Sequence, residues 1–300
     1  MIELELDYLN ATLGVSYTMG STGWIRRDLD LDKIKELYLV EKRSSKQIAR
    51  MFNTSQQTIR RALQDINIPR RSITEANLVA WRDKTYETVI LTERQHHIIL
   101  GTLLGDAGLH IQKSSINPTF SVGHREADQE YTIWKFNELK TSGLFKNSPF
   151  TGVKRFEDGR EFKSKRIRSI QHPILRDYHN LLYSDGRKRI TSQVLDQCNL
   201  LSLAAYYMDD GGLRRAEWYD PDSPKIPCFY TYSYTEEEIL LLRYFLDNRW
   251  GIHSELKEIK YGVPRKVGNL LLVGERSVPR FQELIIPYIL PIQCMHRKIP

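Results

Sequence analysis

The chain has 300 residues, of which 41% are hydrophobic and 27% charged, and its formal net charge is +7. This is enough chain for one large domain and a small one, and the positive balance suits a polyanionic partner. No apolar run approaches the roughly 20 residues of a membrane-spanning helix, and the acidic start differs from an export signal or transit peptide. Three cysteines without Cys-x-x-Cys spacing argue against a disulfide framework. We expect no membrane contact, and a location in the cytoplasm of a bacterial or phage host, or in an organelle matrix if the protein is organelle-encoded.

Residues 31–72 are the first segment with a clear pattern, after residues 1–30, to which the sequence assigns no role. Apolar residues recur there at helical spacing in three short stretches. The small Ala49 allows a close helix crossing, Asn53 can adopt the left-handed turn conformation, and Ile59 fills the core between the helices. At these three positions the segment resembles the helix-turn-helix family, which implies a small all-α DNA-binding domain.

The same segment concentrates positive charge, with 10 Lys and Arg against 4 Asp and Glu. In the helix-turn-helix plan, the recognition helix presents side chains that read base edges or hold phosphates. An ordinary three-helix bundle with a solvated basic face is the alternative. Residues 73–94 are expected to form a partly helical connector. The candidate DNA-binding residues of the module are Gln56, Gln57, Arg60, Arg61, Arg70 and Arg71.

The rest of the chain shows one pattern twice. Residues 99–107 read ILGTLLGDA and residues 203–211 read LAAYYMDDG, each an apolar helical stretch with a small third residue and an aspartate in eighth place. After each stretch the periodicity predicts two strands, an amphipathic helix, two further strands and another helix. The expected elements are strands 108–113, 118–124, 150–157 and 161–170 with helices 127–141 and 173–184, then strands 213–219, 226–233, 252–260 and 266–273 with helices 235–249 and 276–286. A mixed repeat of this length implies two subdomains related by a pseudo-two-fold axis.

The eighth-place acids, Asp106 and Asp210, stand where structure alone disfavours them. An aspartate at a helix C-terminus meets the negative end of the helix dipole, which costs from a few tenths to about 1 kcal/mol. The small residues Gly101 and Ala205 would let the two helices pack closely and bring both acids together. Because Mg²⁺ prefers carboxylate and backbone oxygens, the pattern predicts a divalent-cation site. Two exposed aspartates at helix ends are the alternative.

These two motifs resemble the LAGLIDADG homing endonuclease family in its single-chain, two-motif form, over about residues 95–300. The resemblance implies an α+β fold of two pseudo-symmetric αββαββα repeats, residues 95–197 and 198–300, which form a DNA-binding saddle. Leu104 and Met208 stand where the family name has its first Asp, a position that is often apolar in the family.

The resemblance also implies an active site. Mg²⁺ would be the cofactor, with Mn²⁺ able to substitute and Ca²⁺ binding without supporting cleavage. The implied metal ligands are the carboxylates of Asp106 and Asp210 and the backbone carbonyls of Gly105 and Asp209. The implied basic residues are Lys188 and Lys298, with Arg189 and Arg297 as their alternates.

Residues 154–168 hold 7 Lys and Arg against 3 Asp and Glu, on two expected strands joined by a turn at Asp158-Gly159. Alternation predicts that Lys163, Lys165 and Arg160 share one face that lies against DNA, with a solvated hairpin as the alternative. The other candidate DNA-binding residues are Gln112, Lys113, His124, Arg125, Arg214, Arg215, Trp218, Tyr230, Tyr232, Lys257, Lys260, Arg265 and Lys266.

The sequence therefore predicts a monomeric, metal-dependent homing endonuclease that hydrolyses both strands of a long double-stranded DNA target and leaves short 3′ overhangs. Two alternatives stay open. One is a group I intron RNA maturase, with its own intron RNA as partner; the other is a catalytically inactive transcription regulator of the same fold. Retention of both acids favours cleavage. Because the chain starts at Met1 and ends at Pro300 rather than at His-Asn, an intein is not expected.

Overall fold

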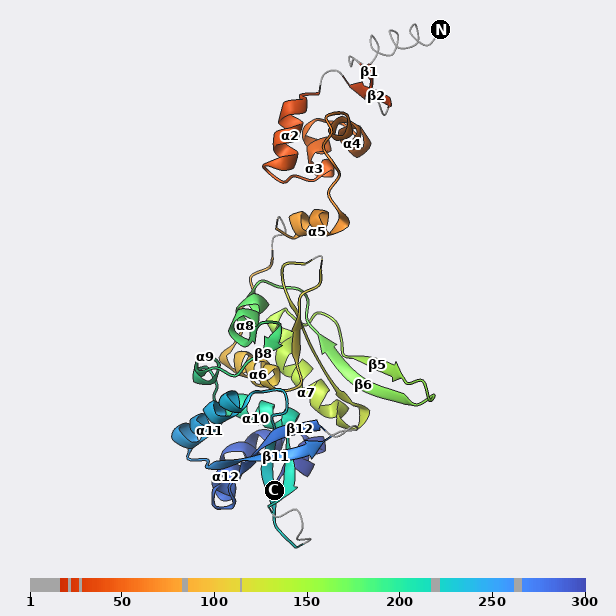
Figure 1. Ribbon diagram of the computed structural model, residues 1–300. Helices are drawn as coiled ribbons and strands as arrows, with labels where there is room; N and C mark the ends of the chain where they lie inside the picture. The colour runs from red at the N-terminus through yellow and green to blue at the C-terminus, as the bar shows by residue number, and fades with distance from the viewer. Residues whose placement is uncertain are drawn as a thin grey trace. The chain divides into compact units, whose positions relative to one another are not determined.

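The computed structural model describes residues 17–20, 23–26, 29–82, 86–113, 115–216, 222–261 and 266–300. Two compact units make up the chain: residues 1–85 with 112–116, and residues 86–111 with 117–300 (Figure 1). Each unit has its own hydrophobic core, and each is described by itself. Within the described ranges, no helix combines the length and apolar character that crossing a membrane requires.

The first unit contains a small antiparallel hairpin and several short helices. Strands β1 (Tyr17–Gly20) and β2 (Gly23–Arg26) pair with each other, in a segment to which the sequence assigns no role. The helices of this unit are α2 (Leu31–Leu39), α3 (Ser45–Met51), α4 (Gln56–Asp65) and α5 (Ile73–Arg82).

Local capping explains where α2, α3 and α4 begin. Asp30, Ser44 and Ser55 each accept a hydrogen bond from a backbone amide in the first turn of the helix that follows. Asn53, between α3 and α4, has a φ of +45°, the left-handed conformation that asparagine tolerates well. The core is formed by apolar side chains from all three helices, among them Ile34, Ile48 and Ile59.

The second unit is built from two copies of one αββαββα arrangement, as the repeat in the sequence predicts. The first copy contains α6 (Glu93–Leu104), β3 (Gly108–His110), β4 (Thr119–Arg125), α7 (Gln129–Leu139), β5 (Phe150–Arg155), β6 (Glu161–Arg168) and α8 (Ile174–Leu182). The second contains α10 (Leu200–Asp210), β9 (Gly211–Arg215), β10 (Lys225–Tyr230), α11 (Glu236–Trp250), β11 (Ser254–Tyr261), β12 (Lys266–Val273) and α12 (Val278–Ile289).

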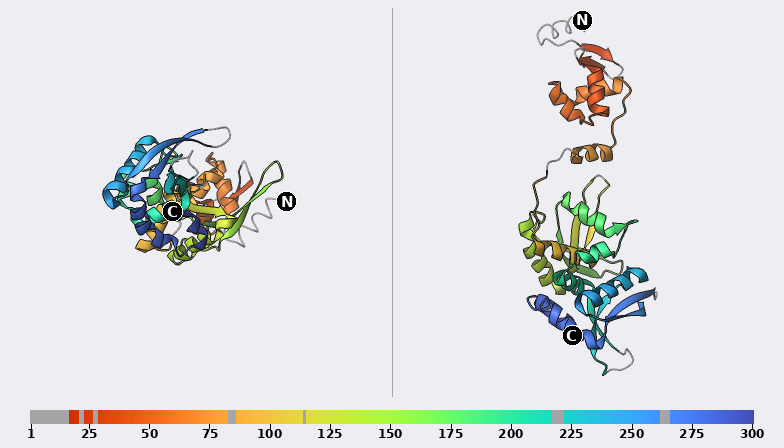
Figure 2. Two further views of the ribbon diagram at one scale, coloured as in Figure 1. Left: turned by 90° about the horizontal axis from the view of Figure 1, so that it is seen from below. Right: turned by 90° about the vertical axis from the view of Figure 1, so that its left-hand side faces the viewer.

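Each copy folds its four strands into an antiparallel sheet with the same strand order. The first sheet runs β3-β4-β6-β5 and the second runs β9-β10-β12-β11, so in each sheet the second strands of the two hairpins pair at the centre. Figures 1 and 2 show the hairpins β5–β6 and β11–β12 projecting from the helical body of this unit. Strand β3 ends at His110, so the expected strand positions Gln112 and Lys113 lie in the loop that follows.

Helices α6 and α10 are the close contact between the two copies. A Cβ atom on Gly101 would lie 2.2 Å from the backbone oxygen of Ser202, so only glycine allows this approach. His97 and Ser202 add a hydrogen bond across the contact, with 3.1 Å between Nδ1 and Oγ. The apolar side chains around both helices belong to one continuous core. The expected close packing of the motif helices is therefore present.

Short elements carry the basic residues that follow each copy. After α8 comes a small hairpin of β7 (Tyr183–Ser184) and β8 (Arg187–Lys188), and then α9 (Ser192–Asp196) leads into α10. The second copy ends in the 3-10 helix η4 (Gln293–Lys298). Both elements return toward the ends of the motif helices, where their lysines form the hydrogen bonds described below.

Candidate active site and nucleic-acid interface

The motif helices bring acidic residues together at one end of their contact. Gly105 caps α6 and Asp106 follows it, whereas Asp209 and Asp210 are the last residues of α10. The backbone N–H of Asp106 donates to Oδ2 of Asp209 at 3.4 Å, so the two helix ends touch. A Cβ atom on Gly105 would lie 2.4 Å from the Cβ of Asp209. Gly105 is therefore needed where Asp209 crosses to the other copy.

The carboxyl group of Asp210 shows the effect of this crowding. Burial and the negative charges of Asp106 and Asp209 raise the pKa of Asp210 to about 7, against the opposing charges of Lys188 and Lys298. Asp106 differs. Burial raises the pKa of Asp106, but the hydrogen bond from His124 and nearby lysine charges outweigh burial and leave it below its usual value. The two predicted acids are thus electrostatically coupled but unequal.

Lys188 and Lys298 each cap the C-terminus of one motif helix. Burial lowers the pKa of both ammonium groups, to about 8 for Lys298, although neighbouring carboxylates oppose the shift. The Nζ of Lys188 donates at 2.9, 2.5 and 3.0 Å to the carbonyls of Leu103, Gly105 and Ala107. The Nζ of Lys298 donates at 3.4, 2.5 and 3.0 Å to the carbonyls of Tyr207, Met208 and Asp209.

The matching contacts of these lysines place one ammonium group beside the acids in each copy. The carbonyls of Gly105 and Asp209, implied metal ligands, accept hydrogen bonds from these lysines. The alternates Arg189 and Arg297 are engaged elsewhere, with Glu238 at 2.6 Å and Asp128 at 2.9 Å. The geometry therefore favours the lysines over the arginines.

A buried group of polar side chains lies behind Asp106. His124, on β4, has its Nδ1 3.3 Å from Oδ2 of Asp106. Lys135, on α7, places its Nζ 2.6 Å from Oδ1 of Asp209 and 3.2 Å from Nε2 of His124. The expectation that His124 contacts DNA is not supported by this geometry, because its side chain is only 7% exposed and turns toward the acids.

Lys135 has no distinguishing mark in the sequence. It lies in an amphipathic helical pattern, where a lysine is usually solvated. Only packing against the sheet shows that its side chain is fully buried. The side chain of Asp209 is likewise fully buried, although the sequence assigned a role only to the backbone carbonyl of this residue.

The acidic residues fit a divalent cation. Potential ligand atoms of Asp106, His124 and Asp209 lie within 4.8 Å of one another, but Lys135 contacts His124 and Asp209, which leaves Asp106 as the accessible ligand of the three. The side chain of Asp106 is 40% exposed, so an ion and its water can reach it. Burial, together with repulsion by the carboxylates of Asp106 and Asp209, raises the pKa of Asp210, and a divalent cation would offset both effects.

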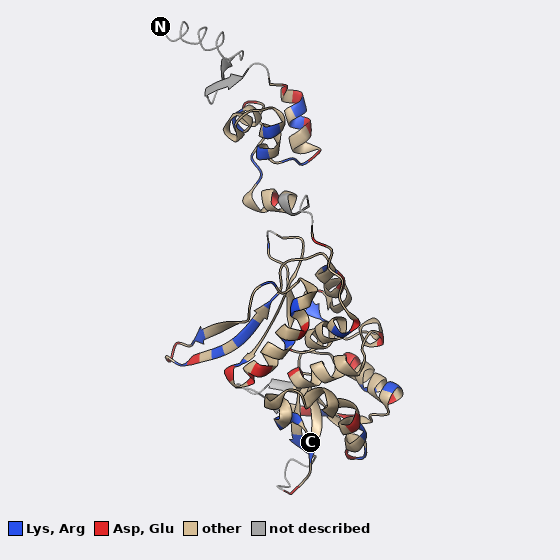
Figure 3. Ribbon diagram, turned by 180° about the vertical axis from the view of Figure 1, so that it is seen from behind, with Lys and Arg blue, Asp and Glu red and all other residues tan. Residues whose placement is uncertain are grey.

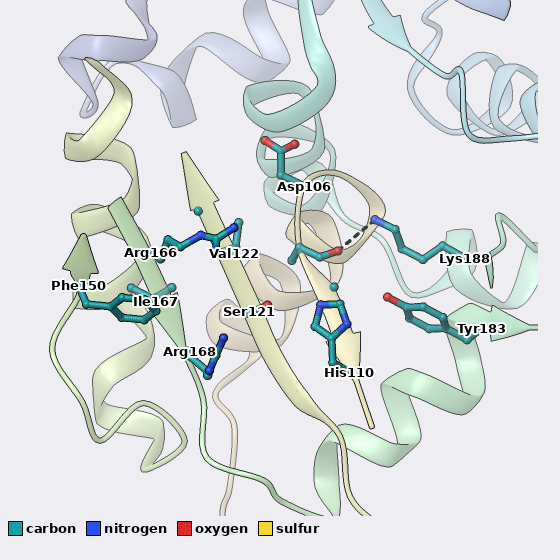
Figure 4. A pocket seen from close by; sticks show the side chains of 13 residues that line it. Asp106, His110, Ser121, Val122, Phe150, Arg166, Ile167, Arg168, Tyr183 and Lys188 are labelled. Carbon is teal, nitrogen blue, oxygen red and sulfur yellow. Dashed lines mark hydrogen bonds between the residues drawn. The ribbon is translucent and has the colours of Figure 1, made fainter. Parts of the chain in front are cut away.

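A pocket of about 430 Å³ opens beside Asp106 and Lys188, against the first sheet (Figure 4). In the strand register, Arg166 lies opposite Gly123 and Arg168 lies opposite Ser121. Cross-strand partners share one face of a sheet, and all four of these residues line the pocket. The pocket wall is therefore the sheet face that carries Arg166 and Arg168.

Lys163 and Lys165 lie on the other face of β6, because successive side chains of a strand alternate. That face also holds the buried Ile167, and Lys165 is half-buried opposite His124. Lys163 and Lys165 therefore face away from this pocket, whereas Arg166 and Arg168 share the pocket face. Arg160 lies in the predicted turn, where its side chain binds Asp158 at 2.6 Å. Figure 3 shows the concentration of Lys and Arg along this hairpin.

The second sheet carries several predicted DNA-binding residues. Arg214, Tyr230 and Lys257 share one face by register, with the Arg214 guanidinium 5.8 Å from the centre of the Tyr230 ring. Arg215 lies on the opposite face of β9, and the ring of Tyr232, just after β10, is 5.8 Å from that of Tyr230. In the first copy, Arg125 is exposed and binds Asp128 at 2.8 Å. Trp218, Arg265 and the side chains of Lys260 and Lys266 lie outside the described parts.

In the first unit, the predicted DNA-binding residues divide into two groups. Arg71 is used inside the unit: its guanidinium donates to backbone oxygens of Tyr38 and Arg43 and stacks 3.9 Å from the Tyr38 ring centre. Gln56 donates to Ser45 Oγ at 3.0 Å, which joins α3 to α4. The residues left to face a ligand are Gln57, Arg60, Arg61 and Arg70.

Comparisons with known proteins agree with this arrangement. The LAGLIDADG DNA endonuclease family matches residues 96–272. A RecA protein from Mycobacterium gastri is 27% identical over 223 residues, which cover 70% of this chain and 48% of that protein. The DNA endonuclease I-ChuI from Chlamydomonas applanata is 24% identical over 220 residues, which cover 70% of this chain and 95% of that enzyme. The chain thus spans about half the length of the first of these relatives.

A solved structure shares the fold. The homing endonuclease I-WcaI bound to its DNA recognition sequence superposes with a TM-score of 0.61 and 18% sequence identity. The match covers 72% of this chain and 88% of that one.

Replacing Asp210 by Asn should stabilise the metal-free protein at neutral and higher pH. The Asp210 carboxyl has a pKa of about 7 in the fold against 3.8 ordinarily, so its contribution to stability falls as the pH rises from about 4 to 7. Asparagine cannot ionise and removes this loss, on the order of 4 kcal/mol at pH 8, with little difference near pH 4.

Urea unfolding in EDTA at both pH values measures the effect, with the exposed Asp185→Asn as a matched control. Mg²⁺ at the higher pH should narrow the gap by stabilising the wild type. Equal unfolding free energies of wild type and Asp210→Asn in EDTA at pH 8 would contradict the crowding of carboxylates.

Proposed function

The chain belongs to the LAGLIDADG DNA endonuclease family, and we propose that it is a homing endonuclease that hydrolyses both strands of a long, specific double-stranded DNA target. The observation that carries this proposal is the meeting of Asp106 and Asp210 at the contact of two repeats with one strand order. The similarity to the DNA endonuclease I-ChuI and to the DNA-bound homing endonuclease I-WcaI supports it. Since one chain holds both halves of the site, it acts as a monomer.

The proposed chemistry is hydrolysis of one phosphodiester bond in each strand. Asp106 and Asp210 would hold Mg²⁺, with Mn²⁺ as a substitute and Ca²⁺ as a non-catalytic ligand. When bound, such ions supply positive charge for the attacking and leaving oxygens. Lys188 and Lys298 add positive charge at the helix ends, and the pKa of Lys298, about 8, suits proton transfer near neutral pH. Short 3′ overhangs are the expected product.

Asp106→Asn and Asp210→Asn should each abolish double-strand cutting, because asparagine keeps the size of the side chain but not the charge that holds a cation. Either variant should nick at most. Conversion of supercoiled plasmids carrying candidate sites to nicked and linear forms measures this, with the exposed Asp196→Asn as control. Gel-shift binding in Ca²⁺ should persist. Linear product at the wild-type rate from either variant would rule out the assignment.

We propose that Arg166, on the first sheet, contacts the DNA. Arg166 lies across Gly123 of β4 and Gly152 of β5: Cβ atoms there would lie 2.6 Å from its Cγ and 2.9 Å from its Cδ. The two glycines therefore form a trough that orients the exposed side chain against the pocket wall. A guanidinium held this way on a strand suits bidentate contact with the O6 and N7 atoms of a guanine.

Arg166→Ala should weaken binding by about 1–3 kcal/mol and relax sequence preference at one base position. Gly123→Ala keeps the arginine but pushes it from the trough, so it should show part of the same loss. Selection from a randomised target library in Ca²⁺ measures both effects. Arg155→Ala is the matched control, since that guanidinium is paired with Glu161 at 2.8 Å. Unchanged preference in Arg166→Ala would contradict base reading by this residue.

We also propose that the first unit is a second DNA-binding module of the helix-turn-helix type. Helix α4 follows the Asn53 turn, as a recognition helix would, and it carries Gln57, Arg60 and Arg61. Arg71 and Gln56 hold the unit together rather than meeting DNA. The module then extends the target site on one flank.

Replacing Gln57, Arg60 and Arg61 together by Ala should lower DNA affinity and shorten the footprint on one flank. Each lost phosphate contact should reduce the slope of log affinity against log salt by about 0.9. Lys33→Ala is the control, because Lys33 on α2 is paired with Glu36 at 2.6 Å. Footprints and salt slopes identical to wild type would mean that this module does not touch the target.

A further inference from the structure

Lys135 holds a fully buried positive charge between the two copies. Its Nζ lies 2.6 Å from Oδ1 of Asp209, 3.2 Å from Nε2 of His124 and 4.1 Å from the centre of the Tyr131 ring. A buried ion is costly unless it is paired and hydrogen-bonded. The Asp209 carboxylate supplies the opposite charge. Burial lowers the pKa of Lys135, against the charge and hydrogen bond of Asp209, which favour the ammonium form.

The donor inventory determines how His124 is protonated. An ammonium group has only donors, so the Nε2 of His124, 3.2 Å away, has to accept its hydrogen bond. A neutral imidazole that accepts at Nε2 carries its proton on Nδ1. That Nδ1 lies 3.3 Å from Oδ2 of Asp106, so its proton faces the Asp106 carboxylate. Both ring nitrogens are then used, and His124 keeps no lone pair for a metal ion.

Both carboxylate oxygens of Asp209 accept hydrogen bonds. Oδ1 receives Lys135, and Oδ2 receives the backbone N–H of Asp106 at 3.4 Å. Its side chain is fully buried, in contrast to the partly exposed Asp106. Asp209 of the second copy therefore supports Asp106 of the first, once through the backbone and once through Lys135 and His124.

The arrangement occurs on one side of the site. Gly105 stands at the seventh motif position of the first copy, where the second copy has Asp209, so Asp210 has no corresponding carboxylate behind it. The groups that shift the pKa of Asp210 act by burial and charge alone, whereas the Nδ1 of His124 lies 3.3 Å from the Asp106 carboxylate. The two acids therefore differ in how firmly they are oriented.

We propose that Asp209, Lys135 and His124 form a positioning relay that orients the Asp106 carboxylate through the Nδ1–H of His124, so that the Asp106 half of the site is preorganised and the Asp210 half is not. The part concerning catalysis rests on the proposed function. Its consequence is that the two DNA strands are cut at unequal rates, and that loss of the relay slows the strand that depends on Asp106.

The protonation of His124 tests the relay without any cleavage. Two-bond proton–nitrogen spectra of ¹⁵N-labelled, metal-free protein distinguish the two neutral tautomers and the imidazolium. The chain has 8 histidines, and the spectrum of His124→Asn identifies the signals of His124 by difference. We expect a neutral ring protonated on Nδ1. A ring protonated on Nε2, or an imidazolium, overturns the relay.

Strand-specific cleavage tests its effect. Lys135→Met should slow one strand by roughly 10- to 100-fold, as loss of an outer orienting partner does, so that nicked plasmid accumulates. Lys135→Met, Asp209→Asn leaves no unpaired buried charge, so it carries the test if the single variant fails to fold. The double variant should also cut one strand slowly. Wild-type rates on both strands would show that the relay residues contribute only packing, and would overturn the relay. The exposed Lys140→Met is the matched control.

Variants of His124 separate positioning from simple packing. Asparagine can place an amide donor near the position of Nδ1, so His124→Asn should retain more first-strand rate than His124→Ala. Equal rates of these two variants overturn the role of the Nδ1–H. A wild-type protein that cuts no DNA but shows the Nδ1–H tautomer refutes the proposed function and leaves the relay standing. Cleavage by a wild type with the opposite tautomer refutes the relay alone.

Discussion

The contact between α6 and α10 is the constraint on which the rest of the site depends. At Gly101 the two backbones approach so closely that a single methyl group would collide with Ser202. At the ends of the helices, Gly105 makes the same allowance for Asp209. Because the helices end at this contact, the last carbonyls of both helices, which lack intrahelical partners, and the carboxylates of Asp106 and Asp210 gather in one small volume.

So much negative charge in one place has to be balanced by positive charge. Both copies provide a lysine at the C-terminus of the motif helix. Lys188 and Lys298 each direct an ammonium group at the last carbonyls of a motif helix, which is the favourable end of the dipole for a cation. Both lysines come from segments that follow the copies in sequence and return to the site in space. The pseudo-symmetry is thus visible in the helix capping as well as in the order of the strands.

The copies differ in how the remaining charge is balanced. Lys135, fully buried, neutralises Asp209 and contacts His124, whereas the raised pKa of Asp210 shows a carboxyl group whose negative charge is incompletely balanced. The difference between the copies begins at the seventh motif position, because the extra carboxylate of Asp209 requires a neighbouring positive charge, which Lys135 provides. The basic residues differ in a similar way: Arg71 makes its contacts within its own unit, while Arg166 lies exposed over two glycines.

Local features of the sequence were sufficient for the two repeats, the eighth-place acids and the three short helices of residues 31–72, because periodicity and capping act over a few residues. Lys188 and Lys298 were implied by the resemblance of the motifs to a known family, and tertiary packing brings each of them to the end of a motif helix. The partners of Asp106 could not be predicted in this way, because His124 and Lys135 reach it only when a strand and a helix of the first copy pack against the end of α10. The face of β6 that carries Arg166 rather than Lys165 was also decided by the tertiary structure, since side chains alternate and a shift of one residue exchanges the two faces of a strand.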